Sequence, residues 1–265
     1  MKYLISGASS SLAKEIAREL TTRGHEILLV GRKSQPEFDF SNLEGILPGL
    51  FENHDVFLHL AHSFEMQIFP DLNQEAANKI IHFLSQPNSS IKRCILISSE
   101  SASANSRSAY GVSKYRSEQV FLISKQSSIL RVGIIDDMSV DSPYNKLKNI
   151  VRKTGVIAFP NLRRKIFTVT TVKDIADNIE KIVAMDLVGG PFCNQSPKSR
   201  KSILEVLEND SVKVNIGLNI PPKMIETIIF GGKKFSLTRR IADSLSSILT
   251  EPEICQEIPE RVPKR

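Results

Sequence analysis

Apolar residues near the start of the chain follow the period of a strand, then that of a helix, then that of a strand again. Lys2–Ser6 is a short, mostly apolar run, and apolar residues then recur every four positions, at Leu12, Ile16 and Leu20. This spacing predicts a helix, which Gly24 can end in the left-handed conformation. Glu26–Val30 is the next apolar run. Together these segments span about 30 residues and predict a βαβ unit with a right-handed crossover.

The same alternation continues to about residue 135. Strands are predicted over Asp55–Leu60, Lys92–Ile97 and Ser128–Val132, and helices over Asp71–Ser85 and Ala109–Lys125. This order is typical of the α/β class with a doubly wound parallel sheet, in which ligands bind beyond the carboxyl ends of the strands.

The second half of the chain is less regular. Prolines interrupt shorter helical and strand-like segments, at Pro143, Pro160, Pro191, Pro197, Pro221 and Pro222. We therefore expect a core over residues 1–135 and a mixed segment over 136–250 that completes the core and forms a smaller, interleaved C-terminal lobe. Residues 251–265 contain three prolines and dense charge, which predict a flexible tail.

Composition excludes several classes of protein. The 265 residues are 41% hydrophobic and 24% charged, as in ordinary globular proteins. A net charge of +6 suits a phosphorylated ligand, but the chain has no long run of like charges and only 6% aromatic residues, so nucleic acid is not expected as a partner. No apolar run is long enough for a membrane span or a signal peptide.

Cysteine and histidine positions argue against disulfides and metal. Cys94, Cys193 and Cys255 lie far apart, which favours a reducing, cytoplasmic location. His59 and His62 lie at the end of a predicted core strand without thiols or a carboxylate cluster, so we expect a structural role and no metal site.

The turn after the first strand is a candidate phosphate site. Gly7 ends the strand, and small residues open the first helix, where backbone N–H groups and the helix dipole favour a pyrophosphate. The predicted contacts are Gly7, Ser9, Ser10, Ser11 and Leu12. An ordinary strand-to-helix turn is the alternative, because the later glycines of a dinucleotide-binding loop are absent.

The end of the second strand bears on the choice of cofactor. Arg32 and Lys33 stand where an NAD enzyme usually has an acid for the ribose hydroxyls, so we predict contacts with the 2′-phosphate of NADP, with NAD as the alternative. Asp39, expected after a third short strand, is a candidate partner for the adenine amino group or a cap for a helix beginning near Asn42.

Tyr110 and Lys114 are the candidate acid–base pair. Four residues apart, they share one face of the predicted helix, and a neighbouring cation favours the phenolate form of a tyrosine. Tyr144 and Lys148 have the same spacing. A buried-looking strand precedes Tyr110 and ends at Ser99, which places a hydroxyl at the edge of the sheet where the cofactor is expected. We therefore predict Ser99, Tyr110 and Lys114 as catalytic residues. Tyr110 and Lys114 are also predicted cofactor contacts, with Lys114 reaching the nicotinamide ribose.

The chain resembles the extended short-chain dehydrogenase/reductases, a Rossmann-type family of nucleotide-sugar epimerases, dehydratases and reductases. Residues 1 to about 250 contain the matching blocks in the family's order. They are the Gly7 loop, Asp55-Val56-Phe57-Leu58-His59-Leu60-Ala61, Ser98-Ser99, Tyr110-x-x-x-Lys114, Arg131, Val172-Lys173-Asp174-Ile175-Ala176 and Phe192-Cys193-Asn194. Ser10 and Ala13 replace the usual later glycines, and the interval from Ser99 to Tyr110 is shorter than in most members.

The resemblance implies an NAD(P)-dependent enzyme that acts on a nucleotide sugar. It adds Phe40, Leu60 and Ala61 to the cofactor contacts and implies a homodimer through the helices at 71–86 and 109–125. The leading hypothesis is a cytoplasmic NADPH-dependent reductase of a nucleotide-activated 4-keto-6-deoxy sugar. A nucleotide-sugar 4-epimerase with bound NAD and a cofactor-sensing or scaffold protein are the alternatives. Candidate partners for the diphosphate are Arg163, Arg164, Lys198, Arg200, Arg239 and Arg240.

Overall fold

A seven-stranded parallel sheet with the order β12-β9-β5-β4-β3-β1-β2 forms the centre of the computed structural model. The structure describes residues 1–34, 36–40, 43–64, 71–137, 139–159, 166–193, 200–210, 212–219 and 256–259. The strands are β1 (Lys2–Ser6), β2 (Glu26–Val30), β3 (Val56–His59), β4 (Arg93–Ser99), β5 (Ser127–Val132), β9 (Gly189–Cys193) and β12 (Gln256–Glu257). Because β2 and β3 flank β1 on opposite sides, the strand order reverses there, as at the ligand-binding position of doubly wound sheets.

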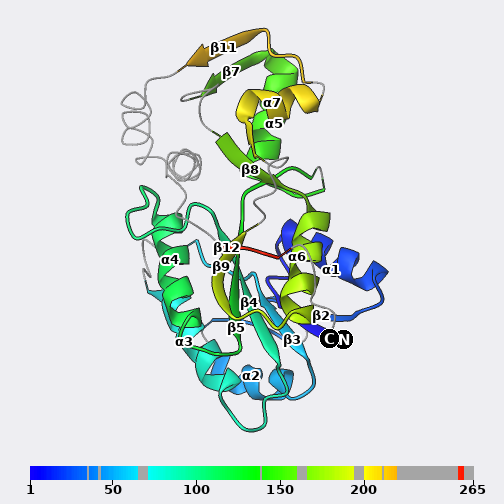
Figure 1. Cartoon of the computed structure of the whole chain (residues 1–265), viewed down its shortest axis with the longest axis vertical. Coiled ribbons are helices and arrows are strands. Elements are labelled where there is room, and N and C mark those ends of the chain that lie inside the picture. Colours follow the sequence, from blue (N-terminus) through cyan, green and yellow to red (C-terminus); the bar gives the residue numbers. More distant parts are fainter. Residues whose placement is uncertain are drawn as a thin grey trace.

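Helices cover both faces of the sheet (Figure 1). One face carries α1 (Ser11–Thr22) and α6 (Val172–Ala184), and the other carries α2 (Leu43–Phe51), α3 (Leu72–Leu84) and α4 (Ala109–Phe121). Successive strand residues point to opposite faces, so Tyr3 and Ile5 pack with α1 and α6, whereas Leu4 packs with the other helices. The predicted α/β class with a doubly wound parallel sheet is confirmed.

Most predicted elements form with small shifts in their bounds. The helix predicted from the spacing of Ile16 and Leu20 is α1, and both of these side chains are fully buried. Gly24 follows it with φ +85°, in the left-handed region that favours glycine. The fourth helix ends at Phe121 rather than Lys125, and Leu122 and Ile123, which follow it, are exposed.

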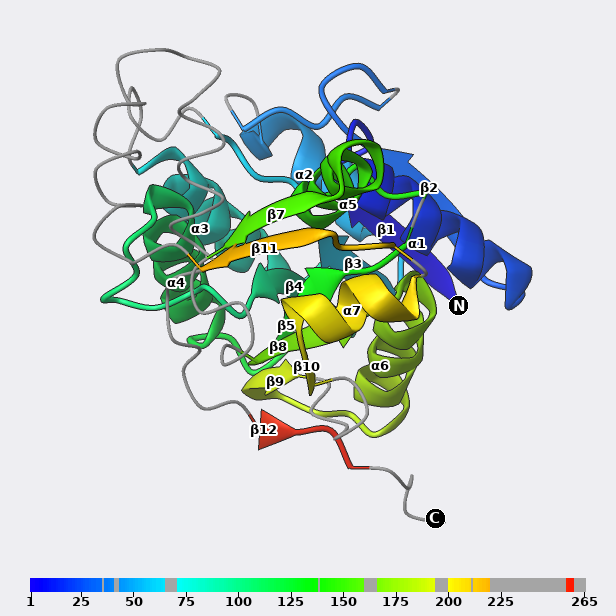
Figure 2. The ribbon, with the colours of Figure 1, turned by 90° about the horizontal axis from the view of Figure 1, so that it is seen from above.

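A smaller lobe lies beside the carboxyl ends of the main strands (Figure 1). It consists of β6 (Ile134–Ile135), α5 (Pro143–Thr154), β7 (Val156–Phe159), β8 (Ile166–Thr170), β10 (Arg200–Ser202), α7 (Ile203–Asn209) and β11 (Ile216–Asn219). It has its own apolar core, which includes Tyr144, Val151 and Leu207. Figure 2 shows β7, β11 and α7 in front of the main sheet when the molecule is viewed from above. Since α6 and β9 return from the lobe to the main sheet, the two parts are interleaved as expected.

The C-terminal stretch departs in part from the expected tail. Gln256 and Glu257 form β12, which pairs in parallel with β9, so these two residues belong to the sheet. Residues 251–255 and 260–265 lie outside the described part of the chain. The domain boundaries stay a prediction. Within the described part, no helix combines the length and the apolar character that a membrane crossing requires.

Candidate active site

The Gly7 loop lies at the point where the strand order reverses. The N–H groups of Gly7 and Ala8 donate to the Val30 carbonyl at 2.9 and 3.0 Å, which ties the loop to the end of β2. Gly7 has φ +100°, and a Cβ at this position would lie 3.1 Å from the backbone nitrogen of Ala61. A residue without a side chain is therefore needed to turn the chain tightly between the ends of β2 and β3.

The first turn of α1 faces the same region. Ser10 is the N-cap in extended conformation, and its side chain makes no capping hydrogen bond within the described structure, which leaves first-turn amides without that partner. The Ser11 hydroxyl oxygen accepts from the Asp141 N–H at 2.8 Å, so it also ties the core to the lobe. Ser9 is exposed, and Leu12 is partly buried. The arrangement fits a phosphate group, and these contacts stay a prediction.

The turn after β2 holds two exposed cations and one unforeseen acid. Arg32 and Lys33 are both exposed, as a role toward an external phosphate requires. Glu37 forms an isolated bridge with Gly31 and so returns to the end of β2, where an acid would face ribose hydroxyls in an NAD enzyme. The sequence argument missed Glu37, because its backbone pairing is not visible in local spacing.

Asp39 and Phe40 lie between this turn and α2. The prediction of a third short strand before Asp39 is wrong, because residues 38 and 39 do not belong to a strand. Helix α2 begins at Leu43, and Asn42 lies outside the described residues. Phe40 and Ala61 are partly buried and pack against the same apolar cluster, and the backbone of Ala61 lies beside Gly7.

Ser6 and His59 fix the end of β3. The backbone N–H groups of Leu60 and Ala61 both donate to Ser6 Oγ at 3.2 Å, and Ser6 Oγ lies 2.9 Å from His59 Nδ1. Burial, aided by the charge of Lys114, lowers the pKa of His59 to about 3, so the ring is neutral. The expected structural role of this histidine is thus supported. In the described ranges, no three or more potential metal-binding side chains gather.

A short serine-rich turn brings Tyr110 back to the end of β4. Ser108 caps α4, accepting from the Gly111 N–H at 2.9 Å. A Cβ at Gly111 would overlap the Ser106 hydroxyl and the Ser101 carbonyl oxygen. This close packing explains how the unusually short interval between Ser99 and Tyr110 is accommodated.

Ser99, Tyr110 and Lys114 come together in the fold. Burial raises the pKa of Tyr110 to about 12, and a hydrogen bond with Ser99 acts in the opposite direction. Lys114 Nζ donates to the Ile97 carbonyl at 2.9 Å and lies 5.9 Å from the centre of the Tyr110 ring. Burial lowers the pKa of Lys114 to about 8. The expected lowering of the Tyr110 pKa by this lysine is not found in the protein alone, where desolvation dominates and only Ser99 opposes it.

A buried ion pair below Lys114 was missed by sequence reasoning. Glu118 accepts two hydrogen bonds from Arg131, at 2.9 and 2.6 Å, and both side chains are 2% exposed. The charge of Glu118 favours the cationic form of Lys114. The available signal was helical spacing, because Glu118 follows Lys114 by four residues, as Lys114 follows Tyr110.

The second Tyr-x-x-x-Lys pair lies in the core of the lobe. The Tyr144 hydroxyl donates to Asp210 at 3.1 Å, and Lys148 Nζ contacts Asp136 at 2.8 Å and Asp210 at 2.6 Å. Burial and the two carboxylates raise the pKa of Tyr144. These contacts hold α5 to its neighbours. They give Tyr144 and Lys148 a structural role that requires no part in catalysis.

Arg200 is the predicted diphosphate partner that the structure describes. It lies in β10 and is exposed. Burial raises the pKa of Glu100, and the charge of Arg200 is one of the effects that act in the opposite direction. Arg200 pairs with Thr168 of β8, and Thr168 forms a hydrogen bond with Glu100, the residue after Ser99. The other five basic candidates, Arg163, Arg164, Lys198, Arg239 and Arg240, lie outside the described residues.

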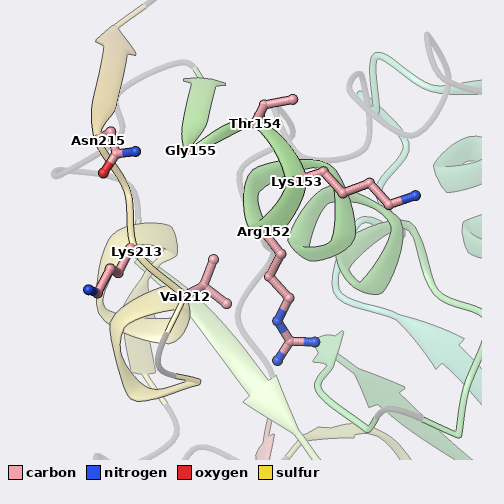
Figure 3. Close-up of a pocket in the computed structure, with 7 residues that line it drawn as sticks. All are labelled: Arg152, Lys153, Thr154, Gly155, Val212, Lys213 and Asn215. Carbon is pink, nitrogen blue, oxygen red and sulfur yellow. The ribbon is translucent and has the colours of Figure 1, made fainter.

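A separate hollow of about 410 Å³ lies at the end of α5 in the lobe (Figure 3). Arg152, Lys153 and Lys213 are among the described residues that line it, and the predicted catalytic and cofactor residues are not. Lys153 and Lys213 point away from each other, so the cations do not converge on one ligand position.

The homodimer expected through α3 and α4 stays a prediction. The outward faces of these helices are polar and include Glu75, Asn78, His82, Arg116 and Gln119.

Comparison with known proteins gives structural similarity alone. No model of a protein family matches the chain, and no curated protein matches its sequence. A dTDP-4-dehydrorhamnose reductase from Bacillus anthracis in complex with NADP has a TM-score of 0.66 at 18% identity, over 84% of this chain and 86% of that one.

Two further solved structures are similar. A UDP-N-acetylglucosamine 4-epimerase from Bacillus cereus has a TM-score of 0.65 at 17% identity, over 83% and 85% of the two chains. MoeE5 in complex with UDP-glucose and NAD has a TM-score of 0.64 at 17% identity, over 83% and 85%. The chain therefore shares the Rossmann-type fold of these three structures, in agreement with the doubly wound parallel sheet expected from its sequence.

Proposed function

We propose that the protein is an NADPH-dependent reductase of a nucleotide-linked keto sugar, with the 4-keto-6-deoxy type as the first substrates to test. The observation that supports this most directly is the group formed by Ser99, Tyr110 and Lys114 beside the carboxyl ends of β3 and β4. A tyrosine and a buried lysine at that edge are equipped to move a proton next to a bound dinucleotide.

The proposed reaction adds two hydrogens to a carbonyl group. Held by the Gly7 loop and by Arg32 and Lys33, NADPH would supply the hydride for the carbonyl carbon and would leave as NADP⁺. Tyr110 donates its phenolic proton to the carbonyl oxygen, which becomes a hydroxyl, and Ser99 holds that oxygen by a hydrogen bond. Lys114 keeps a positive charge near the resulting phenolate, and Glu118 favours this charged form. Solvent then returns a proton to Tyr110.

In this proposal, basic residues at two positions bind the phosphate groups of the cofactor and of the substrate. Arg32, with Lys33, binds the 2′-phosphate of the cofactor from the exposed turn after β2. Arg200 binds the diphosphate of the sugar nucleotide, since it lies in the lobe and is close enough to affect the pKa of Glu100. Similar solved structures with NADP or a UDP-sugar bound are consistent with both roles.

The first experiment is a reductase assay. Purified protein is mixed with NADPH and a panel of nucleotide-linked 4-keto-6-deoxy sugars, and loss of the reduced cofactor is followed by absorbance. Oxidation of NADPH with at least one sugar is expected, and no oxidation with any of them would contradict the reductase proposal.

Replacement of Arg32 tests the cofactor assignment. Arg32→Ala removes a charge-assisted contact with the 2′-phosphate, so the Kd for NADPH should rise about tenfold or more while the Kd for NADH changes little. Arg18→Ala is the matched control, because Arg18 is exposed on α1 and pairs with Glu15. An equal effect of Arg32→Ala on both cofactors would show that this residue does not recognise the 2′-phosphate.

A nucleotide-sugar 4-epimerase with bound NAD is the second candidate. Glu37 favours it, because the Gly31 bridge returns this acid to the position where an NAD enzyme holds ribose hydroxyls. An epimerase takes back the hydride that it removes, so it benefits from retaining one NAD. Release of NAD from the denatured purified protein, together with sugar interconversion without added cofactor, would favour this reaction over net reduction.

A further inference from the structure

His62 has a buried nitrogen beside the proposed catalytic tyrosine. Its ring is 5.0 Å from the Tyr110 ring, centre to centre, with the two planes at 79°. Phe64 stacks on the same tyrosine at 5.9 Å and also contacts His62 at 5.1 Å. Within the described part of the chain, Nε2 of His62 is buried and has no hydrogen-bond partner. This nitrogen therefore remains available next to the group proposed to donate the proton.

The position of His62 is fixed from two helices. Asn73 on α3 accepts from the backbone N–H of Ser63 at 2.8 Å and donates to the Ser63 carbonyl at 2.9 Å. The same amide donates to the Ser113 hydroxyl on α4 at 3.1 Å. Since Ser63 adjoins His62 and Ser113 adjoins Lys114, this network holds the histidine in register with the catalytic helix. The imidazole is thus positioned before any ligand binds.

Packing alone does not explain a histidine here. The ring lies against two aromatic rings, where a phenylalanine would fill a similar space without a buried polar atom. A buried nitrogen without a partner costs about 1 to 3 kcal/mol, so the protein would be more stable without it. Burial, aided by the charge of Lys114, holds the pKa of His62 well below its usual range. The neutral ring offers one donor and one acceptor, which suits a neutral hydroxyl better than a phosphate or carboxylate.

We propose that Nε2 of His62 forms a hydrogen bond with a hydroxyl group of the bound ligand, next to the oxygen served by Tyr110. The hydroxyl belongs either to the ribose at the nicotinamide end of the cofactor or to the sugar substrate. Both are compatible with a residue that follows Leu60 and Ala61, which lie beside Gly7, and that contacts the proposed catalytic tyrosine. This inference rests on the proposed function, since it assigns a further binding residue to the same site.

The test separates the nitrogen from the ring. His62→Phe keeps an aromatic ring against Tyr110 and removes the hydrogen-bonding atom, whereas His62→Gln places an amide near the position of Nε2. His25→Phe is the control, because His25 contacts Tyr3 and Glu180 at the α1–β2 turn, on the opposite side of the sheet from Tyr110. Calorimetry measures the Kd for NADPH and for UDP-glucose and dTDP-glucose as unreactive probes, and the reductase assay measures kcat and KM.

His62→Phe should weaken one binding step about tenfold, the usual scale of one lost ligand hydrogen bond, without lowering Tm. A higher Kd for NADPH assigns the ribose hydroxyl. A higher Kd or KM for the sugar nucleotide with unchanged NADPH binding assigns the sugar hydroxyl. His62→Gln should recover part of the loss, and His25→Phe should leave all binding constants unchanged.

The outcomes distinguish this inference from the proposed reaction. If His62→Phe binds NADPH and both sugar nucleotides as tightly as the original protein and its kcat/KM is unchanged, the hydrogen bond does not exist, whatever the reaction. If the original protein reduces no sugar, the reductase proposal fails, while a His62-dependent Kd for NADPH or a sugar nucleotide still supports the assigned contact.

Discussion

Two tyrosines with identical spacing to a lysine should respond in opposite ways to loss of their hydroxyl groups. Tyr110 lies beside Ser99 at the edge of the main sheet, whereas Tyr144 donates to Asp210 in the core of the lobe. Tyr110→Phe removes the proposed proton donor and keeps the ring packed against His62 and Phe64. Tyr144→Phe removes a structural hydrogen bond and no proposed catalytic group.

The magnitudes follow from these contacts. Loss of a general acid lowers kcat by roughly 100-fold or more, so Tyr110→Phe should lose activity on that scale with little change in NADPH affinity. A hydrogen bond to a charged group contributes about 1.5 to 3 kcal/mol. In Tyr144→Phe, Asp210 retains Lys148 as a partner and is 24% exposed, so the loss lies near the lower end of that range. About 1.5 kcal/mol corresponds to a fall in Tm of about 3 °C for a chain of this size.

The assay compares kcat with the keto sugar, Kd for NADPH and Tm for both variants in the same buffer. The expected pattern is an inactive, stable Tyr110→Phe and an active, destabilised Tyr144→Phe. Equal losses of kcat in both variants, or an unchanged kcat in Tyr110→Phe, would refute the assignment of the catalytic group from strand context.

Two further predictions concern packing and pH. Gly111→Ala should destabilise the protein by about 1 to 3 kcal/mol and lower kcat, because the added Cβ overlaps the turn that brings Ser99 to Tyr110. Gly49 lies in helix α2, and no described atom lies within 4 Å of the position that an added Cβ would take. Gly49→Ala should therefore raise the free energy of unfolding by about 0.5 to 1 kcal/mol in urea titrations. A similar loss of stability in both glycine variants would contradict the packing argument. Burial lowers the pKa of Lys114 to about 8, so the unfolded chain binds more protons above that pH and the contribution of this residue to stability rises between pH 8 and 10. The stability of Lys114→Met relative to the original protein should therefore fall by on the order of 2 kcal/mol across this range, and a pH-independent difference would show that the ammonium is not desolvated.

The amino-acid sequence by itself predicts the architecture of the core. The alternation of apolar runs with helical spacing from Lys2 to Val132 predicts a parallel sheet with helices on both faces, because each period defines which side of an element is buried. The same order predicts that Gly7, Ser99 and Tyr110 meet at one edge, since parallel strands end on the same side. Structural neighbours share this fold.

Only the tertiary structure distinguishes residues with similar local patterns. Tyr110 and Tyr144 have the same spacing to lysine, and their partners Ser99 and Asp210 come from distant segments. The return of Glu37 to the end of β2 likewise depends on backbone pairing that no local period encodes.

The two histidines at the end of β3 differ for the same reason. His59 Nδ1 is bonded to Ser6, while Nε2 of His62 has no partner among the described residues and lies beside Tyr110. They are only three positions apart in the sequence, but hydrogen bonding and burial depend on which strands and helices pack around each ring. The sequence therefore determines the main elements of the core and their assembly into a doubly wound parallel sheet, whereas the site's chemistry depends on side-chain contacts between elements that only the folded chain brings together.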